Sequence, residues 1–110
     1  MLTPHFLTEF NMSSPLTARE VCQRLREAAL GVVTFEVCAR PDVTGLVTVD
    51  IEGWSLLLDF ADQRLHHCEY ARSPAGQEGT LASWQRYGMD PVSLLSTWEL
   101  EQVERLLQNK

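Results

Sequence analysis

Two β-strands and the tight turn between them can be read from Val47-Thr48-Val49-Asp50-Ile51-Glu52-Gly53-Trp54-Ser55-Leu56-Leu57-Leu58-Asp59-Phe60. In the first half, apolar side chains alternate with a threonine and an aspartate, which is the period of a strand with one buried face. Glu52-Gly53 then predicts a tight turn. In the second half, every other residue from Trp54 to Phe60 is large and apolar, so these side chains share one face of the second strand.

The segments on both sides of this hairpin extend it to a four-stranded sheet. Residues 33–37 alternate between apolar and polar side chains, and a turn-rich connection over 40–45 leads from them into the hairpin. After the turn at 61–64, residues 65–71 predict a fourth strand. Because short links join consecutive strands, neighbouring strands must be antiparallel and the sheet is a meander. We interpret residues 72–79 as a surface loop.

A capping box, Thr17-Ala18-Arg19-Glu20, marks the start of a helix before the sheet. Apolar residues then follow at helical spacing, and Gly31 supplies a left-handed stop. The sequence therefore predicts a first helix over roughly 18–30, whose apolar stripe consists of Val21, Cys22, Leu25, Ala28 and Ala29.

The last quarter of the chain contains further helix signals. Residues 80–87 can form one or two helical turns that end at Gly88. Asp90 is suited to cap a following helix, and Pro91 is suited to its first turn. We expect this helix to run to about Gln108, and a second capping-box pattern at Ser96-Thr97-Trp98-Glu99 indicates where it can kink or split.

The fold class expected from these signals is α+β: an N-terminal helix, a four-stranded antiparallel meander, and a C-terminal helix that is kinked or split near Ser96. Each helix has one apolar stripe to bury, so we expect both on one face of the sheet. Residues 1–14 are predicted to be a flexible leader, and residues 15–110 a single α+β domain. The other sheet face is polar and acidic but keeps Leu57, which makes it a candidate partner surface.

The charge of the chain excludes some classes of partner. Its formal net charge is −6, and residues 32–71 hold two arginines against seven acids, or −5 of that total. Nucleic-acid binding needs a basic stripe, so a nucleic-acid partner is not expected. The acids are interpreted first as the solvated face of the sheet, and alternatively as a patch for a basic protein.

The cysteines and apolar runs bear on the location of the protein. The chain has three cysteines, an odd number without a close pair, which indicates small buried thiols in a reducing compartment. It shows no signal peptide and no apolar run long enough to cross a bilayer. We therefore expect a cytoplasmic protein without a membrane partner.

One cluster of potential metal ligands is present, His66-His67-Cys68-Glu69. On a regular strand His66 and Cys68 point the same way, but a tetrahedral metal site needs three or four ligands. A thiolate–imidazole pair is also weakly supported, because residues two apart on a strand are separated by about 7 Å. No phosphate-binding glycine loop or serine-nucleophile motif is present. We therefore predict no catalytic residue, no metal and no cofactor, with His66 and Cys68 as the remaining metal candidates.

Three aromatic residues, Trp84, Tyr87 and Trp98, surround the predicted helix junction. They can form an aromatic-lined groove for a peptide or small ligand. The favoured interpretation is instead a hydrophobic clasp that pins the last helix to the sheet edge and buries Trp98.

Three blocks of the sequence resemble a known family. They are Leu16-Thr17-Ala18-Arg19-Glu20-Val21-Cys22, Gly53-Trp54-Ser55-Leu56, and the segment from Tyr87-Gly88 to Trp98-Glu99. They occur in the family's order, and the resemblance extends over about residues 15–107. The family is one of small bacterial proteins of unknown function. The resemblance implies a soluble bacterial protein and carries over no activity, ligand or catalytic residue. Family members have cysteines and acids in place of His66-His67, which further disfavours a metal site.

Together these observations predict a non-catalytic module, monomeric or homodimeric, that binds another protein as an adaptor or regulator. Narrower forms are an immunity-type protein that neutralises a basic toxin and a chaperone for a secreted effector. The alternative is a metal-binding protein or small enzyme that uses His66, His67 and Cys68. The candidate partner surface consists of Asp50, Leu57, Asp59, Trp84 and Tyr87.

Overall fold

The computed structural model describes residues 15–39 and 45–108. The described elements are α2 (Ala18–Leu30), β1 (Phe35–Ala39), β2 (Leu46–Ile51), β3 (Trp54–Ala61), β4 (Arg64–Arg72), β5 (Glu78–Thr80), α3 (Leu81–Gln85), the 3₁₀ helix η1 (Pro91–Leu94) and α4 (Thr97–Gln108). The predicted leader over 1–14 and most of the predicted turn over 40–45 lie outside the described residues.

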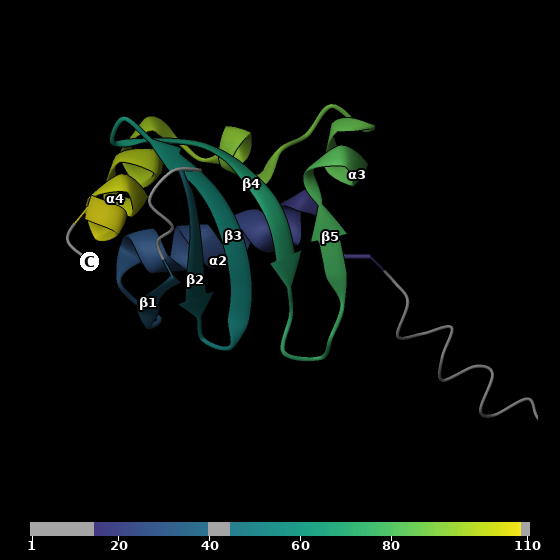
Figure 1. The fold of residues 1–110 in the computed structure, drawn as a ribbon, viewed down its shortest axis with the longest axis horizontal. Helices are drawn as coiled ribbons and strands as arrows, with labels where there is room; N and C mark the ends of the chain where they lie inside the picture. The colour runs from purple at the N-terminus through teal and green to yellow at the C-terminus, as the bar shows by residue number, and fades with distance from the viewer. Residues whose placement is uncertain (1–14, 40–44, 109–110) are drawn as a thin grey trace, which may run out of the picture.

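The sheet is an antiparallel meander, as predicted. Its strands are ordered β1-β2-β3-β4-β5, so each strand pairs with its neighbour in the sequence. Figure 1 shows α2 running behind the sheet. The α+β class is therefore confirmed, but the sheet has five strands rather than the four expected.

The additional strand is β5, in a segment where the sequence pattern predicts a loop and the start of a helix. Two hydrogen bonds close the β4–β5 connection: the Ser73 amide donates to the Gln77 carbonyl at 2.9 Å, and the Gln77 amide donates to Ser73 Oγ at 3.1 Å. Thr80 then pairs with Tyr70. A three-residue strand with a glycine at its centre is too short to show alternation, so only its pairing identifies it.

One hydrophobic cluster joins the helices to the sheet. It combines the apolar stripes of α2 and α4 with alternate side chains of β2 and β3, and its fully buried members include Val21, Leu25, Val49, Ile51, Leu56, Leu58, Val103 and Leu107. The predicted first helix is confirmed at 18–30. Its capping box is formed, with the Glu20 amide 3.1 Å from Thr17 Oγ1 and the Thr17 amide 2.9 Å from Glu20 Oε1.

Strand β4 departs from simple alternation. Its buried residues are Leu65, Cys68 and Ala71, which are three apart rather than two. The register with β3 shifts twice, leaving His66 and Glu69 without a paired residue. Each β-bulge inserts one extra residue and restores the next apolar side chain to the core face.

The C-terminal helical region is split, which settles the alternative left open by the sequence. Asp90 caps η1 by accepting from the Val92 amide at 3.2 Å. A new helix, α4, begins after Ser96, and Ser96 and Glu99 form the predicted capping box through bonds of 3.1 and 2.8 Å.

The predicted burial of Trp98 is wrong, because its side chain is 52% exposed. Trp98 precedes the buried Val103 by five residues, which rotates it about 140° around the helix from the apolar stripe. Trp84 is buried, and its indole Nε1 donates to the Leu16 carbonyl at 3.0 Å. The buried aromatic side chain of the predicted clasp is therefore Trp84, which contacts the segment that enters α2 beside β5. Trp98 does not anchor α4 to the sheet.

Candidate functional site

The sheet face opposite α2 carries a central apolar and hydroxyl row. Through the strand pairing, Thr48 lies beside Leu57, Leu57 beside Tyr70, and Tyr70 beside Thr80. These side chains alternate with the buried ones, so they point away from the core. No described helix lies over this face in Figure 1. We call it the open sheet face.

The charges on the open sheet face are mainly negative. A second row across the strands joins Glu36, Asp50, Ser55, Arg72 and Glu78. Asp59, two residues beyond Leu57, adds a further carboxylate. Four carboxylates against one guanidinium leave these positions with a net charge of −3.

Two of these carboxylates are held in place by hydrogen bonds. Asp50 Oδ1 accepts from the Gly53 amide at 3.0 Å, at the β2–β3 turn. The Tyr70 hydroxyl donates to Glu78 Oε2 at 2.8 Å, and this bond to an anionic acceptor raises the pKa of Tyr70. The acidic rim is therefore partly ordered around the central row.

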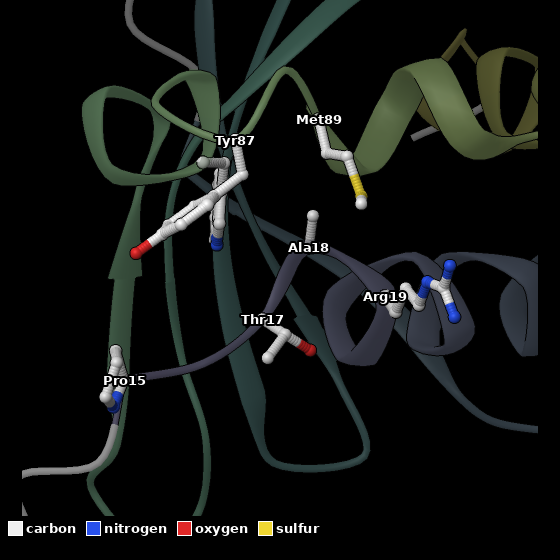
Figure 2. A pocket seen from close by; sticks show the side chains of 7 residues that line it. Pro15, Thr17, Ala18, Arg19, Tyr87 and Met89 are labelled. Carbon is white, nitrogen blue, oxygen red and sulfur yellow. The ribbon is translucent and has the colours of Figure 1, made fainter.

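A groove of about 450 Å³ lies elsewhere, between the start of α2 and the segment after α3. Figure 2 shows the Tyr87 ring extended beside the chain that enters α2, with Met89 above Ala18. The described residues that line the groove are mostly apolar, and Arg19 carries the only charge among them. They are Pro15, Thr17, Ala18, Arg19, Trp84, Tyr87 and Met89.

The wall of the groove formed by Trp84 is held by several hydrogen bonds. The Trp84 indole is bonded to the Leu16 carbonyl, and the Leu16 amide donates to the Glu78 carbonyl of β5 at 3.0 Å. The Trp84 carbonyl also accepts from the amides of Tyr87 and Met89, at 3.0 and 3.2 Å. Tyr87 is 76% exposed, so a large aromatic side chain projects into solvent from an ordered turn.

The five residues predicted as a partner surface fall into two places. Asp50, Leu57 and Asp59 lie together on the open sheet face, as strand alternation predicts. Trp84 and Tyr87 instead line the groove at the start of α2. Sequence reasoning missed the residues at 15–19 and Met89 as groove residues, because only the fold brings positions almost seventy residues apart together.

The alternative site at His66, His67 and Cys68 is dispersed by the β-bulges. His66 is exposed, whereas Cys68 is fully buried, so the two side chains do not share a face as simple alternation predicts. His67 Nδ1 lies 3.2 Å from Asp90 Oδ2. Cys68 Sγ donates to the Tyr70 carbonyl at 3.4 Å, and burial raises the pKa of its thiol.

This environment keeps Cys68 in the neutral thiol form, which is a poor nucleophile and metal ligand. Within residues 15–39 and 45–108, no group of three or more His, Cys, Asp or Glu side chains is placed to hold a metal ion. In the same part of the chain, no helix combines the length and apolar character needed to cross a membrane.

Comparisons with known proteins place the chain in a family without assigning it an activity. No curated protein and no solved structure matched it. A family match extends over residues 15–109, which begins two residues before the α2 capping box and includes every described strand and helix. The chain belongs to the family described as "Domain of unknown function (DUF7693)".

Proposed function

We propose that this protein is a non-catalytic interaction module whose open sheet face binds a basic region of another protein. The observation that carries the proposal is the arrangement of that face, where Leu57 and Tyr70 lie side by side, with Asp50 on β2, Asp59 two residues along β3 from Leu57, and Glu78 on β5. An apolar centre with a polar rim is the usual anatomy of a protein interface.

The charge of the face supports a basic partner. Acidic side chains speed the encounter with a cationic surface and disfavour acidic competitors. The two narrower forms considered from the sequence, an immunity-type protein against a basic toxin and a chaperone for a secreted effector, are both compatible with this surface. A basic client is common to both forms of the proposal.

The structure offers less support to the metal-binding or enzymatic alternative. Its candidate nucleophile, Cys68, is buried and protonated, whereas His66 is exposed and has no paired residue on β3. We further propose a reducing, cytoplasmic location, because Cys22, Cys38 and Cys68 are all free thiols.

The test is affinity capture from the native host, with captured proteins identified by mass spectrometry. The wild-type chain is compared with a Glu36→Lys, Asp59→Lys double variant on the open sheet face. A Glu101→Lys, Asp62→Lys double variant is the matched control, since it makes the same charge change at exposed positions of α4 and the β3–β4 turn.

We expect wild type and control to capture the same partner, with recovery at least about tenfold lower for the open-face variant. Measured with the purified partner, the affinity should also fall with added salt. Equal capture by all three proteins would show that the open sheet face is not the binding surface. Turnover of a substrate in a broad activity screen, without any captured partner, would favour the enzymatic alternative.

A further inference from the structure

We infer that the groove beside Tyr87 is a second docking site, which takes one apolar side chain of an acidic peptide segment. This inference goes beyond the proposed function, since it concerns a different surface and a partner of opposite charge. It rests on three observations: the groove is open and lined mostly by apolar residues, Arg19 on its rim has no ion-pair partner among the described residues, and the neighbouring Glu20 is bonded to Thr17.

The groove is open on its Tyr87 side, which suits a side chain presented by a peptide better than a free small molecule. Small-molecule sites enclose most of the surface of their ligand, whereas one wall of this groove is a Tyr87 ring that is 76% exposed. Met89 and the small exposed part of the buried Trp84 provide further apolar surface. An aromatic or aliphatic side chain that projects from a polypeptide fits such a half-open site, because the rest of the peptide can lie along its rim.

Arg19 is available to recognise an acidic group. Arg24 is paired with Glu27 at 3.1 Å, and Arg26 with Glu99 at 3.0 Å. Within the described part of the chain, Arg19 makes no comparable hydrogen bond or ion pair. It lies on the rim of the groove and also lines two neighbouring hollows along α2.

The carboxylate of Glu20, next to Arg19 in the sequence, is bonded to Thr17 and forms no ion pair with Arg19. Glu20 Oε1 accepts from the Thr17 amide at 2.9 Å and from the Thr17 hydroxyl at 3.1 Å, as part of the capping box. An apolar groove with one unpaired cation on its rim is complementary to a segment in which an apolar residue is flanked by acids.

The test is a titration of the full-length ¹⁵N-labelled protein by NMR with three short peptides. The probe is acetyl-Gly-Asp-Phe-Asp-Gly-amide. One comparison peptide replaces both acids by lysine, and the other replaces phenylalanine by serine. We expect the probe to shift the amide signals of Ala18, Arg19 and Tyr87 and to bind at least about fivefold more tightly than either comparison peptide.

Variants of Arg19 and Tyr87 test whether these side chains bind the peptide or only stabilise the fold. Arg19→Glu should reverse the preference, so that the lysine peptide binds better than the acidic one. This variant should stay folded, because an acidic residue is favourable in the first turn of a helix. Arg105→Glu, the same change at an exposed position of α4, should leave the preference unchanged. Tyr87→Ala should abolish saturable shifts, whereas Tyr87→Phe should retain them.

Several outcomes would overturn the inference. If the Arg19→Glu variant still preferred the acidic peptide, Arg19 would not be the residue that recognises the acidic side chains. Shifts confined to Leu57 and Tyr70 would place the peptide on the open sheet face instead. Tyr87 shifts that depend on protein concentration would assign the groove to a second copy of the chain. Ring contacts between Tyr87 and residues 1–14 in the free protein would assign it to the chain's own first residues.

Discussion

Replacing Gly79 by alanine should destabilise the protein through a collision with Trp84. A Cβ atom at position 79 would lie 2.7 Å from Trp84 Cζ2 and 3.1 Å from the Leu16 carbonyl oxygen. Ordinary carbon–carbon contacts are about 3.5–4.0 Å, so the ring and the new methyl group would overlap by about 0.8 Å or more. The indole cannot turn aside without losing its hydrogen bond to Leu16.

The expected cost follows from these contacts. Overpacking of a tight core typically costs about 1–3 kcal/mol. Alanine recovers about 0.5–1 kcal/mol of this, because it loses less backbone entropy than glycine in a strand. We therefore expect Gly79→Ala to lower the free energy of unfolding by about 1 kcal/mol, within the span of about 0–2.5 kcal/mol that the two ranges leave, measured by urea denaturation monitored by circular dichroism.

A double-mutant cycle tests whether Trp84 is the cause. Trp84→Leu by itself should destabilise, because it leaves a cavity and an unpaired Leu16 carbonyl. In that background Gly79→Ala should cost much less, because the ring is absent and only the 3.1 Å approach to the Leu16 carbonyl oxygen remains. If Gly79→Ala cost the same free energy with and without the indole, the collision would not explain the glycine at this position.

Three further predictions concern local features of the fold. The β3–β4 turn has a positive φ of 64° at Gln63, so Gln63→Gly should raise the free energy of unfolding by about 0.5–1 kcal/mol in urea denaturation; a lower value would show that the glutamine side chain makes a compensating contact. Hydrogen bonds from Thr34 lower the pKa of Glu52 below its ordinary value of 4.5. Glu52→Gln should therefore destabilise at neutral pH, and its difference from wild type should disappear as the pH falls through the lowered pKa, whereas a constant difference would exclude the carboxylate charge as the cause. Cys38 is exposed and the other two cysteines are buried, so one thiol should react rapidly with Ellman's reagent and two only on unfolding; three fast thiols would contradict the buried positions.

Much of the fold could be predicted because its signals are local. The capping box at Thr17 and the stop at Gly31 define α2 through contacts within one turn. The period-two alternation of β2 and β3 identifies the face that carries Leu57 and Asp59. The acidic candidate surface was therefore predictable before its strands were paired.

Features that depend on distant contacts were missed. Strand β5 exists because residues 78–80 pair with β4, and its central glycine fits beneath Trp84. The bulges in β4 separate His66 from Cys68, which strict alternation places together. The exposure of Trp98 is a different case, because its helical spacing from the buried Val103 is a local signal from which it could have been predicted.

The sequence by itself determined the class of this protein, the limits of its first helix, and the acidic character of one sheet face, since capping, periodicity and charge act between near neighbours in the chain. Only the tertiary structure decided that Trp84 and Tyr87 belong to a groove with Arg19 and not to the open sheet face. The walls of that groove are joined by a hydrogen bond between Leu16 and Trp84, which are 68 residues apart. A contact between residues so far apart in the chain leaves no periodic or capping signal in the sequence.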